Sequence, residues 1–323
     1  MAHDATPPKT TAAAPQATDV AAVGRRYVEA GYLFAAVGAI LFSTKAVAIK
    51  LAYQDHVDAE TLLALRMAFA TPFYLVIGLH ALRERRRTGE ALPTLRLAAA
   101  TASVGLLGYW VASYLDFLGL EHVSAQIERL ILFTYPIFVV IFGALFFHQR
   151  ITQNALIAVA ISYAGLALIF GESTATGGHD ALLGGGLVLA CAVAFALYQL
   201  FAKDLIGAIG PRLFTCIAMT AAAVGAIVQF FLTHPASALA VSGRVLATAL
   251  FIAIGSTVLP SFFLNAALHR ISAQANATIG TLSPVVTIIL AYLILGETLS
   301  PLAWAGTALV IAGLGWFTFS ERR

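Results

Sequence analysis

The stretch GYLFAAVGAILFSTKAVAIKLAY, residues 31–53, is apolar over a length that crosses a lipid bilayer as a helix. A bilayer core about 30 Å thick takes roughly 20 helical residues to cross. Stretches of this kind recur along nearly the whole chain, in which 60% of the 323 residues are hydrophobic and only 11% are charged. The sequence therefore predicts an integral membrane protein and excludes a water-soluble fold.

Apolar length and polar punctuation divide the chain into about ten such spans. They cover residues 31–53, 60–82, 97–118, 125–147, 154–171, 183–203, 213–232, 245–268, 274–295 and 301–319. Each span is expected to be a helix, because lipid offers no partner for open backbone polar groups. The spans leave almost no sequence for a soluble domain, so the expected fold class is an all-α integral membrane protein of ten transmembrane helices.

Basic residues are concentrated in every second connection between these spans. If the N-terminus is cytoplasmic, the inner connections and tails hold 14 of the 19 Lys and Arg residues, whereas the outer connections hold Arg244 alone. Membrane proteins retain positive charge on the cytoplasmic side. We therefore expect both termini in the cytoplasm and the protein in the cell (inner) membrane. Because topology accounts for the basic residues, they do not indicate a nucleic-acid partner.

The sequence contains an internal repeat. A shift of 148 residues lays Ser124-Ala125-Gln126 on Ser272-Ala273-Gln274 and Pro136 on Pro284. The match runs through two consecutive expected spans without a gap. Self-similarity over a fixed shift indicates that the two halves of the chain share one structural plan.

The repeat divides the chain into two halves of five spans. A looser match, at a shift near 154 residues, sets Gly31 against Gly185. The expected organisation is a disordered cytoplasmic tail at 1–28, a first repeat at 29–173 and a second repeat at 182–321. Because five is odd, the two repeats must lie upside down relative to each other. Inverted repeats of this kind are common in secondary transporters, which enclose a site near the middle of the membrane.

Motifs in both halves resemble one family. The connection GLEHVSA (119–125) is followed by a mid-span Pro136, and its second copy ALHRISA (267–273) leads through Pro284 to GETL (296–299). This pattern resembles the EamA-like drug/metabolite transporter superfamily over about residues 30 to 320. The first half departs from it with His148-Gln149, where the second half has Gly296-Glu297. The resemblance implies a ten-helix inverted-repeat carrier of small organic metabolites, often an exporter.

Six charged residues fall inside spans 1 to 4, and residue counting puts all of them in the outer half of the membrane. They are Lys45, Lys50, Arg66, Asp116, Glu128 and Arg129. A charge at this depth is costly and normally faces a cavity or a partner. Lys50 and Asp116 are close enough to span ends to reach the interface instead, and Arg129 has an alternative role as a structural tie to a neighbouring helix. Lys45, Arg66 and Glu128 are the strongest functional candidates.

The charges suggest what the site binds and how it closes. Four positive and two negative groups favour an anionic or zwitterionic solute such as an amino acid. Glu128 is expected to meet Arg66 or Lys45 and close the outer side as an ion pair. The carboxylates of Glu128 and Asp116 also make protons the expected coupling ion.

The second half carries neutral polar groups at the corresponding places. The repeat shifts set Asn276 against Glu128 and Gln199 against Lys45, and inversion places both toward the cytoplasm. Tyr135 is expected near the site, although packing is the commoner role of such aromatics. The candidate substrate-binding or gating residues are Lys45, Arg66, Glu128, Arg129, Tyr135, Gln199 and Asn276.

Two prolines inside spans are expected to kink their helices. Pro136 and Pro284 lack an N–H, so they release the carbonyls of Leu132 and Gly280. Small residues in spans 5 and 10, including Gly165 and Gly306, form seams that suit close helix packing or a homodimer.

Other function classes fit the sequence less well. All eight His residues fall in the tail, in connections or at span ends. No HExxH motif, phosphate-binding loop or pair of intramembrane Asp residues is present, so we expect no catalytic residues, no metal and no cofactor. A passive channel or a solute-sensing membrane protein is the alternative, and a membrane-embedded enzyme is the least favoured one.

Overall fold

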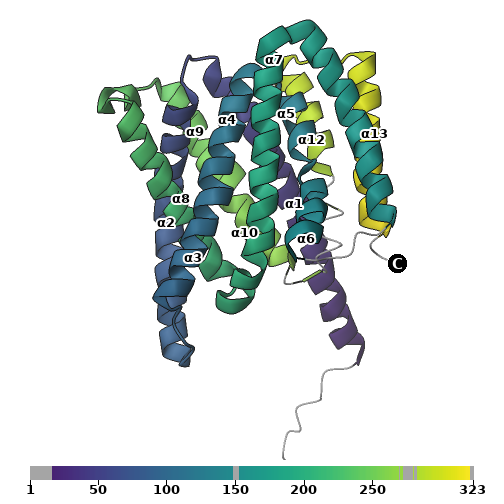
Figure 1. The fold of residues 1–323 in the computed structure, drawn as a ribbon. Coiled ribbons are helices and arrows are strands. Elements are labelled where there is room, and N and C mark those ends of the chain that lie inside the picture. Colours follow the sequence, from purple (N-terminus) through teal and green to yellow (C-terminus); the bar gives the residue numbers. More distant parts are fainter. Residues whose placement is uncertain (1–16, 148–152, 269, 272–278, 280–281, 321–323) are drawn as a thin grey trace, which may run out of the picture.

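The computed structural model describes residues 17–147, 153–268, 270–271, 279 and 282–320, and the described part is a bundle of long helices (Figure 1). In chain order these are α1 (Ala17–Tyr53), α2 (Ala59–Thr88), α3 (Leu95–Gly105), η1 (Leu106–Val111), α4 (Ala112–His122), α5 (Ala125–Leu132), α6 (Tyr135–Phe147), α7 (Gln153–Ile209), α8 (Pro211–Thr233), η2 (Ala236–Leu239), α9 (Gly243–Ala253), η3 (Ile254–Val258), α10 (Leu259–Leu268), α12 (Leu282–Leu290), η4 (Ala291–Leu295) and α13 (Pro301–Ser320). The expected all-helical fold class is confirmed. Helix α1 begins at Ala17, so it includes part of the segment 1–28 that we expected as a disordered tail.

Seven helical segments of the described part are long and apolar enough to cross a membrane. They cover Arg26–Tyr53, Ala59–Thr88, Leu95–His122, Ala125–Phe146, Gly178–Ile209, Pro211–Thr233 and Gly243–Leu264. Two further apolar helices, Ser283–Leu295 and Pro301–Gly313, are shorter. The structure therefore shows a multi-span membrane protein, whereas the count of ten spans stays a prediction.

The long helix α7 consists of two legs. Gly178 interrupts it with a non-helical backbone, φ 59° and ψ −137°, which an L side chain would strain. Figure 1 shows the chain turning over at the top of α7, so that one leg descends beside α13 and the other continues toward α8. The turn falls between the expected spans 154–171 and 183–203.

The two halves share a widened turn at the same place. The π-helical segment η1 begins at Leu106, and the π-helical segment η3 begins 148 residues later at Ile254. This is the shift that aligns the sequence motifs. π-Helical turns are rare and often lie at functional sites, because the extra residue redirects neighbouring side chains. Here the widened turns precede Ser113 and include Thr257, which meet the same arginine.

The helix of span 4 is interrupted near its middle. Helix α5 ends at Leu132 and α6 starts at Tyr135, with Phe133 and Thr134 between them. The Thr134 hydroxyl donates to the Ile131 carbonyl (2.6 Å), and the Ile137 N–H donates to the Thr134 carbonyl (2.9 Å). Pro136 therefore lies in the first turn of α6, where a missing N–H costs nothing. The interruption lies in the turn directly before Pro136, where the missing N–H was expected to disturb the helix, so the kink at Pro136 stays a prediction.

Pro284 lies in the first turn of α12 as the structure describes it. Gly280, whose carbonyl we expected Pro284 to release, lies outside the described residues. The kink at Pro284 therefore stays a prediction.

The small-residue seams of the expected spans 5 and 10 pack against each other within the chain. A Cβ added to Gly165 would lie 2.5 Å from the Gly306 carbonyl oxygen, so the backbones of α7 and α13 approach too closely for larger side chains. The seam joins the first half of the chain to the second. This contact accounts for the small residues without a homodimer, which stays an expectation.

Candidate functional site

Five charged side chains from four helices lie together inside the bundle. Lys45 comes from α1, Arg66 from α2, Asp116 from α4, and Glu128 and Arg129 from α5. We call these five residues the charged layer. Lys45 is the most exposed of them at 6%, and Glu128 and Arg129 are at 0%. Buried charges require partners, so each contact in the layer is informative.

Lys45 and Asp116 form a short ion pair. Lys45 Nζ lies 2.7 Å from Asp116 Oδ2, and both side chains are buried. Asp116 Oδ1 has no hydrogen-bond partner in the described part of the chain. The alternative that Asp116 reaches the membrane interface is therefore wrong. Lys50, for which we also considered that it reaches the membrane interface, is partly exposed, and its Nζ donates to the Leu120 carbonyl (2.9 Å).

Glu128 and Arg129 carry the unsatisfied groups of the layer. Arg129 Nε lies 3.8 Å from Glu128 Oε2, beyond hydrogen-bond distance. All three guanidinium nitrogens of Arg129 lack hydrogen bonds within the described residues, and the Glu128 carboxylate oxygens have no partner there except the neighbouring Asp116 carboxyl group, which lies within reach if one of the two acids is protonated. A buried charged group without hydrogen bonds is costly, so the unsatisfied atoms make Glu128 and Arg129 candidates for binding a polar ligand.

Phe42 provides an aromatic contact for two of the cations. The Arg129 guanidinium lies 5.4 Å and the Lys45 ammonium 5.5 Å from the centre of the Phe42 ring. Cations over an aromatic face are stabilised by the ring quadrupole. Phe42 thus helps to hold Arg129 in the layer without using any of its N–H donors.

Arg66 links the two halves of the chain through hydroxyl groups. Its Nε donates to Thr257 Oγ1 (3.1 Å) and its Nη1 donates to Ser113 Oγ (3.2 Å). The expected ion pair between Glu128 and either Arg66 or Lys45 is wrong in this structure. Lys45 forms its ion pair with Asp116, and Arg66 donates hydrogen bonds to the two hydroxyls.

An aromatic group connects Tyr135 with the second half. Tyr135 and Phe195 meet edge to face with ring centres 5.0 Å apart, and Phe195 stacks on Tyr198 at 5.5 Å. The Tyr198 and Tyr109 hydroxyls are 2.8 Å apart. Gln199 lies within hydrogen-bonding reach of the Tyr135 hydroxyl. The structure thus brings together two sequence candidates, Tyr135 and Gln199.

Asn276, the remaining sequence candidate, lies outside the described residues. Ser113, Thr257 and Phe42 contact the charged layer but were not among the candidates. Ser113 precedes Asp116 by three residues and therefore lies on the same helix face, a spacing that could have identified it. Thr257 carries no such signal, because the π-helical turn of η3 sets its direction.

Two carboxylates cap the N-termini of helices α2 and α5. Glu297 Oε1 accepts from the Ala125 N–H (3.1 Å) and Glu297 Oε2 from the Gln126 N–H (3.3 Å), at the start of α5. Glu121 Oε1 accepts from the Ala59 N–H (2.9 Å) at the start of α2. Lys50 interacts electrostatically with both carboxylates. We call this end of the bundle, with Glu121 and Glu297, the capped end.

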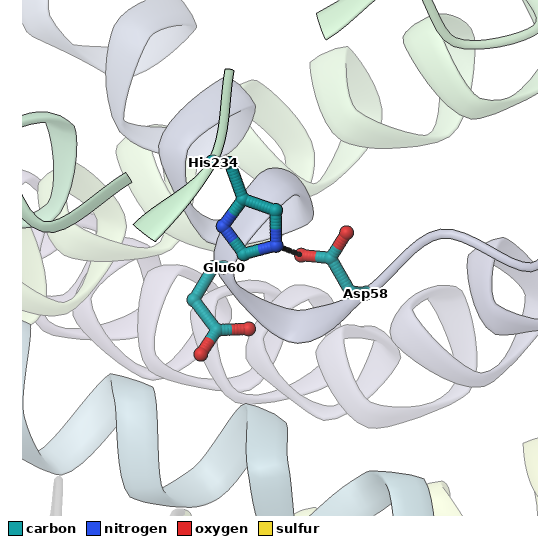
Figure 2. Close-up of side chains that lie close together, drawn as sticks. All are labelled: Asp58, Glu60 and His234. Atoms are coloured by element: carbon teal, nitrogen blue, oxygen red, sulfur yellow. Dashed lines mark ion pairs between the residues drawn. The ribbon is translucent and has the colours of Figure 1, made fainter. Parts of the chain in front are cut away.

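Asp58, Glu60 and His234 form a second cluster near the start of α2. Figure 2 shows the His234 ring facing the Asp58 carboxylate, with Nε2 and Oδ1 3.7 Å apart. The ligand-type atoms of the three residues lie within 4.8 Å of one another, whereas two ligands bonded to one zinc ion at about 2.1 Å would be roughly 3.4 Å apart. Asp58 accepts from the Thr61 N–H (2.7 Å), and Glu60 accepts from the Tyr114 hydroxyl (2.7 Å). Helix capping and hydrogen bonding therefore account for these acidic groups.

Comparison with known proteins places the chain among transporters. The model of the EamA-like transporter family matches residues 29–171 and 182–319. The uncharacterized transporter YcbK of Bacillus subtilis is 30% identical over 305 residues, which cover 90% of this chain and 94% of that protein. A crystal structure of a protein superposes with a TM-score of 0.62 at 18% identity, covering 91% of this chain and 99% of the other, and so agrees with the fold alone.

Two relatives have names that mention a solute. A probable terminal-alkyne amino-acid exporter of Streptantibioticus cattleyicolor is 29% identical over 247 residues, 74% of this chain and 77% of that protein. A probable amino-acid metabolite efflux pump of Salmonella typhimurium is 28% identical over 210 residues, 62% of this chain and 70% of that protein.

Proposed function

The chain belongs to the EamA-like transporter family, and we propose that it is a secondary transporter that exports a small zwitterionic or anionic metabolite, such as an amino acid, by alternating access. The unsatisfied Glu128 and Arg129 pair carries the proposal. The names of the two amino-acid-related relatives agree with it.

The contacts of the charged layer indicate a zwitterion. The Lys45 and Asp116 pair is internally neutral, and Arg66 is bonded to hydroxyls. Free hydrogen-bonding capacity then remains on Asp116 Oδ1 and on the oppositely charged pair of Glu128 and Arg129. A guanidinium binds a carboxylate through two parallel hydrogen bonds, and a carboxylate accepts from an ammonium group. An amino acid offers both groups in one small molecule.

The proposed orientation places the capped end outside the cell. The opposite ends of α2 and α8 carry Arg85, Arg86, Arg87 and Arg212, which suits the cytoplasmic side of the cell (inner) membrane. Both termini are then cytoplasmic. Protons are the proposed coupling ion, because the buried carboxylates Glu128 and Asp116 can gain or lose a proton as access alternates.

Transport by purified protein in liposomes tests this function. Flux should be measured over a panel of amino acids, organic acids, nucleotides and cationic dyes. We expect saturable flux of a zwitterionic or anionic solute that is accelerated by the same solute on the far side. Counter-flow is the signature of a carrier whose loaded site reorients. Flux that stays linear in concentration, without acceleration from the far side, would instead show a channel.

A further inference from the structure

We infer that Glu297 is a positioning residue of the transport site, which holds the start of α5 and thereby Glu128 and Arg129, and whose release accompanies opening of the site toward the capped end. The inference rests on the proposed function, because it assigns Glu297 to the site that binds the transported solute. Glu297 lies in the second half of the chain and α5 in the first.

Three hydrogen bonds join Glu297 to α5. The two carboxylate oxygens accept from the backbone N–H groups of Ala125 (3.1 Å) and Gln126 (3.3 Å), while the Glu297 carbonyl accepts from Gln126 Nε2 (3.0 Å). A carboxylate at a helix start meets the positive end of the helix dipole as well as free N–H donors. The contact is therefore a charge-assisted clasp between the two halves.

Helix α5 is short enough to follow this clasp as a unit. It has 8 residues, and the break at Phe133 and Thr134 separates it from α6. Glu128 begins the intrahelical bonding, because its N–H donates to the Ser124 carbonyl (3.0 Å). The start of α5 is thus within one turn of Glu128 and Arg129, so a displacement at Ala125 moves both charged side chains.

The same end of the bundle offers a matched control. Glu121 also caps a helix with a carboxylate, but it accepts from Ala59 at the start of α2, which does not carry the Glu128 and Arg129 pair. Replacing either glutamate by glutamine removes one charge and keeps the shape. Only the change at Glu297 is expected to loosen α5.

Native Cys191 is a suitable reporter of access to the charged layer. The chain has 2 cysteines, so Cys216→Ala leaves Cys191 as the only thiol. Cys191 is 4% exposed and lies close enough to Asp116, Lys45, Glu128 and Arg129 for electrostatic interaction. A membrane-impermeant thiol reagent would be applied to right-side-out and inside-out vesicles that carry the full chain with Cys216→Ala.

We expect Glu297→Gln to raise the labelling rate of Cys191 about tenfold from one membrane face only, since a charge-assisted cap is lost there. Glu121→Gln is expected to leave this rate within about twofold. An unchanged rate in Glu297→Gln, or an equal rise in Glu121→Gln, would overturn the inference.

If Glu297→Gln yields too little folded protein, Glu297→Asp keeps the charge but has a shorter reach. This variant should raise the labelling rate of Cys191 about threefold, and no rise would again overturn the inference.

The labelling needs no solute, so it is independent of the transport assay. If Glu297→Gln speeds the labelling of Cys191 from one face but no tested solute is transported, the proposed function is refuted and the role of Glu297 in holding α5 is supported. If the protein shows saturable flux but Glu297→Gln leaves the labelling of Cys191 unchanged, the role of Glu297 is refuted and the proposed function is supported.

Discussion

Glu128 and Arg129 are neighbours in the sequence, and their charged groups lie 3.8 Å apart in the interior of the bundle, where neither side chain is exposed. Adjacent residues on a helix normally point about 100° apart. Here both side chains are fully buried, and the Arg129 guanidinium also lies over the Phe42 ring of α1. Such a pair is destabilising for the fold unless a ligand uses it.

Arg129→Lys should reduce transport at least tenfold while membrane insertion and yield stay unchanged. A lysine keeps the charge but loses the planar pair of donors that binds a carboxylate. The measurement is solute uptake into proteoliposomes, normalised to inserted protein. Arg212→Lys is the control, because Arg212 pairs with Glu84 (3.0 Å) at an exposed position. Normal transport by Arg129→Lys would contradict a role of this guanidinium in solute binding.

Lys45→Ala should destabilise the protein by about 3–5 kcal/mol, because it leaves Asp116 buried and unpaired. The double variant Lys45→Met with Asp116→Asn removes both charges and should recover most of this loss. Thermal unfolding in detergent measures both effects. The pair of partly exposed Arg85 and exposed Glu90 is the control, since Arg85→Ala should cost at most about 1 kcal/mol. Equal stability of Lys45→Ala and the unchanged protein would show that water satisfies Asp116.

The sequence predicted which charges are buried but not how they pair. Lys45, Arg66 and Glu128 stand out because a charge within an apolar span is costly wherever it lies. Pairing depends on which helices face each other, and Lys45 meets Asp116 across 71 residues of sequence. Apolar length could not reveal the break between α5 and α6 either, since together they make up one stretch long enough and apolar enough to span a membrane. The repeat shift did anticipate a structural match, because η1 and η3 occupy corresponding positions.

Thr257→Val should weaken transport and stability together. The change keeps the side-chain shape but removes the hydroxyl that accepts from Arg66 Nε (3.1 Å), so a buried N–H loses its partner at a cost of about 1–3 kcal/mol. Among the described residues, Arg66 would then keep its hydrogen bond to Ser113 in the first half and lose the one to the second. Thermal unfolding and uptake should be measured beside Thr248→Val, whose hydroxyl bonds within its own helix. If both valine variants behave alike, the link between the halves has no special role.

Tyr198→Phe should favour the state that is open to the cytoplasm. In the proposed orientation, Glu297 joins the two halves at the capped end through charge-assisted hydrogen bonds, whereas the aromatic group on the cytoplasmic side is held by neutral bonds such as that between the Tyr109 and Tyr198 hydroxyls (2.8 Å). Removing one neutral hydrogen bond costs about 1 kcal/mol, which shifts a two-state ratio about fivefold.

Thiol labelling at Gln199 measures that shift. With Cys191 and Cys216 replaced by alanine, Gln199→Cys should react readily with an impermeant reagent from the cytoplasmic face, and Tyr198→Phe should speed this reaction about fivefold. Tyr163→Phe is the control, because Tyr163 meets Phe138 on α6 through its ring, and this change keeps the ring. Charge-assisted caps outweigh neutral bonds, so the protein without solute should rest mostly open to the cytoplasm. Faster labelling of Gln199→Cys from the outer face would show that the two ends close in the opposite order.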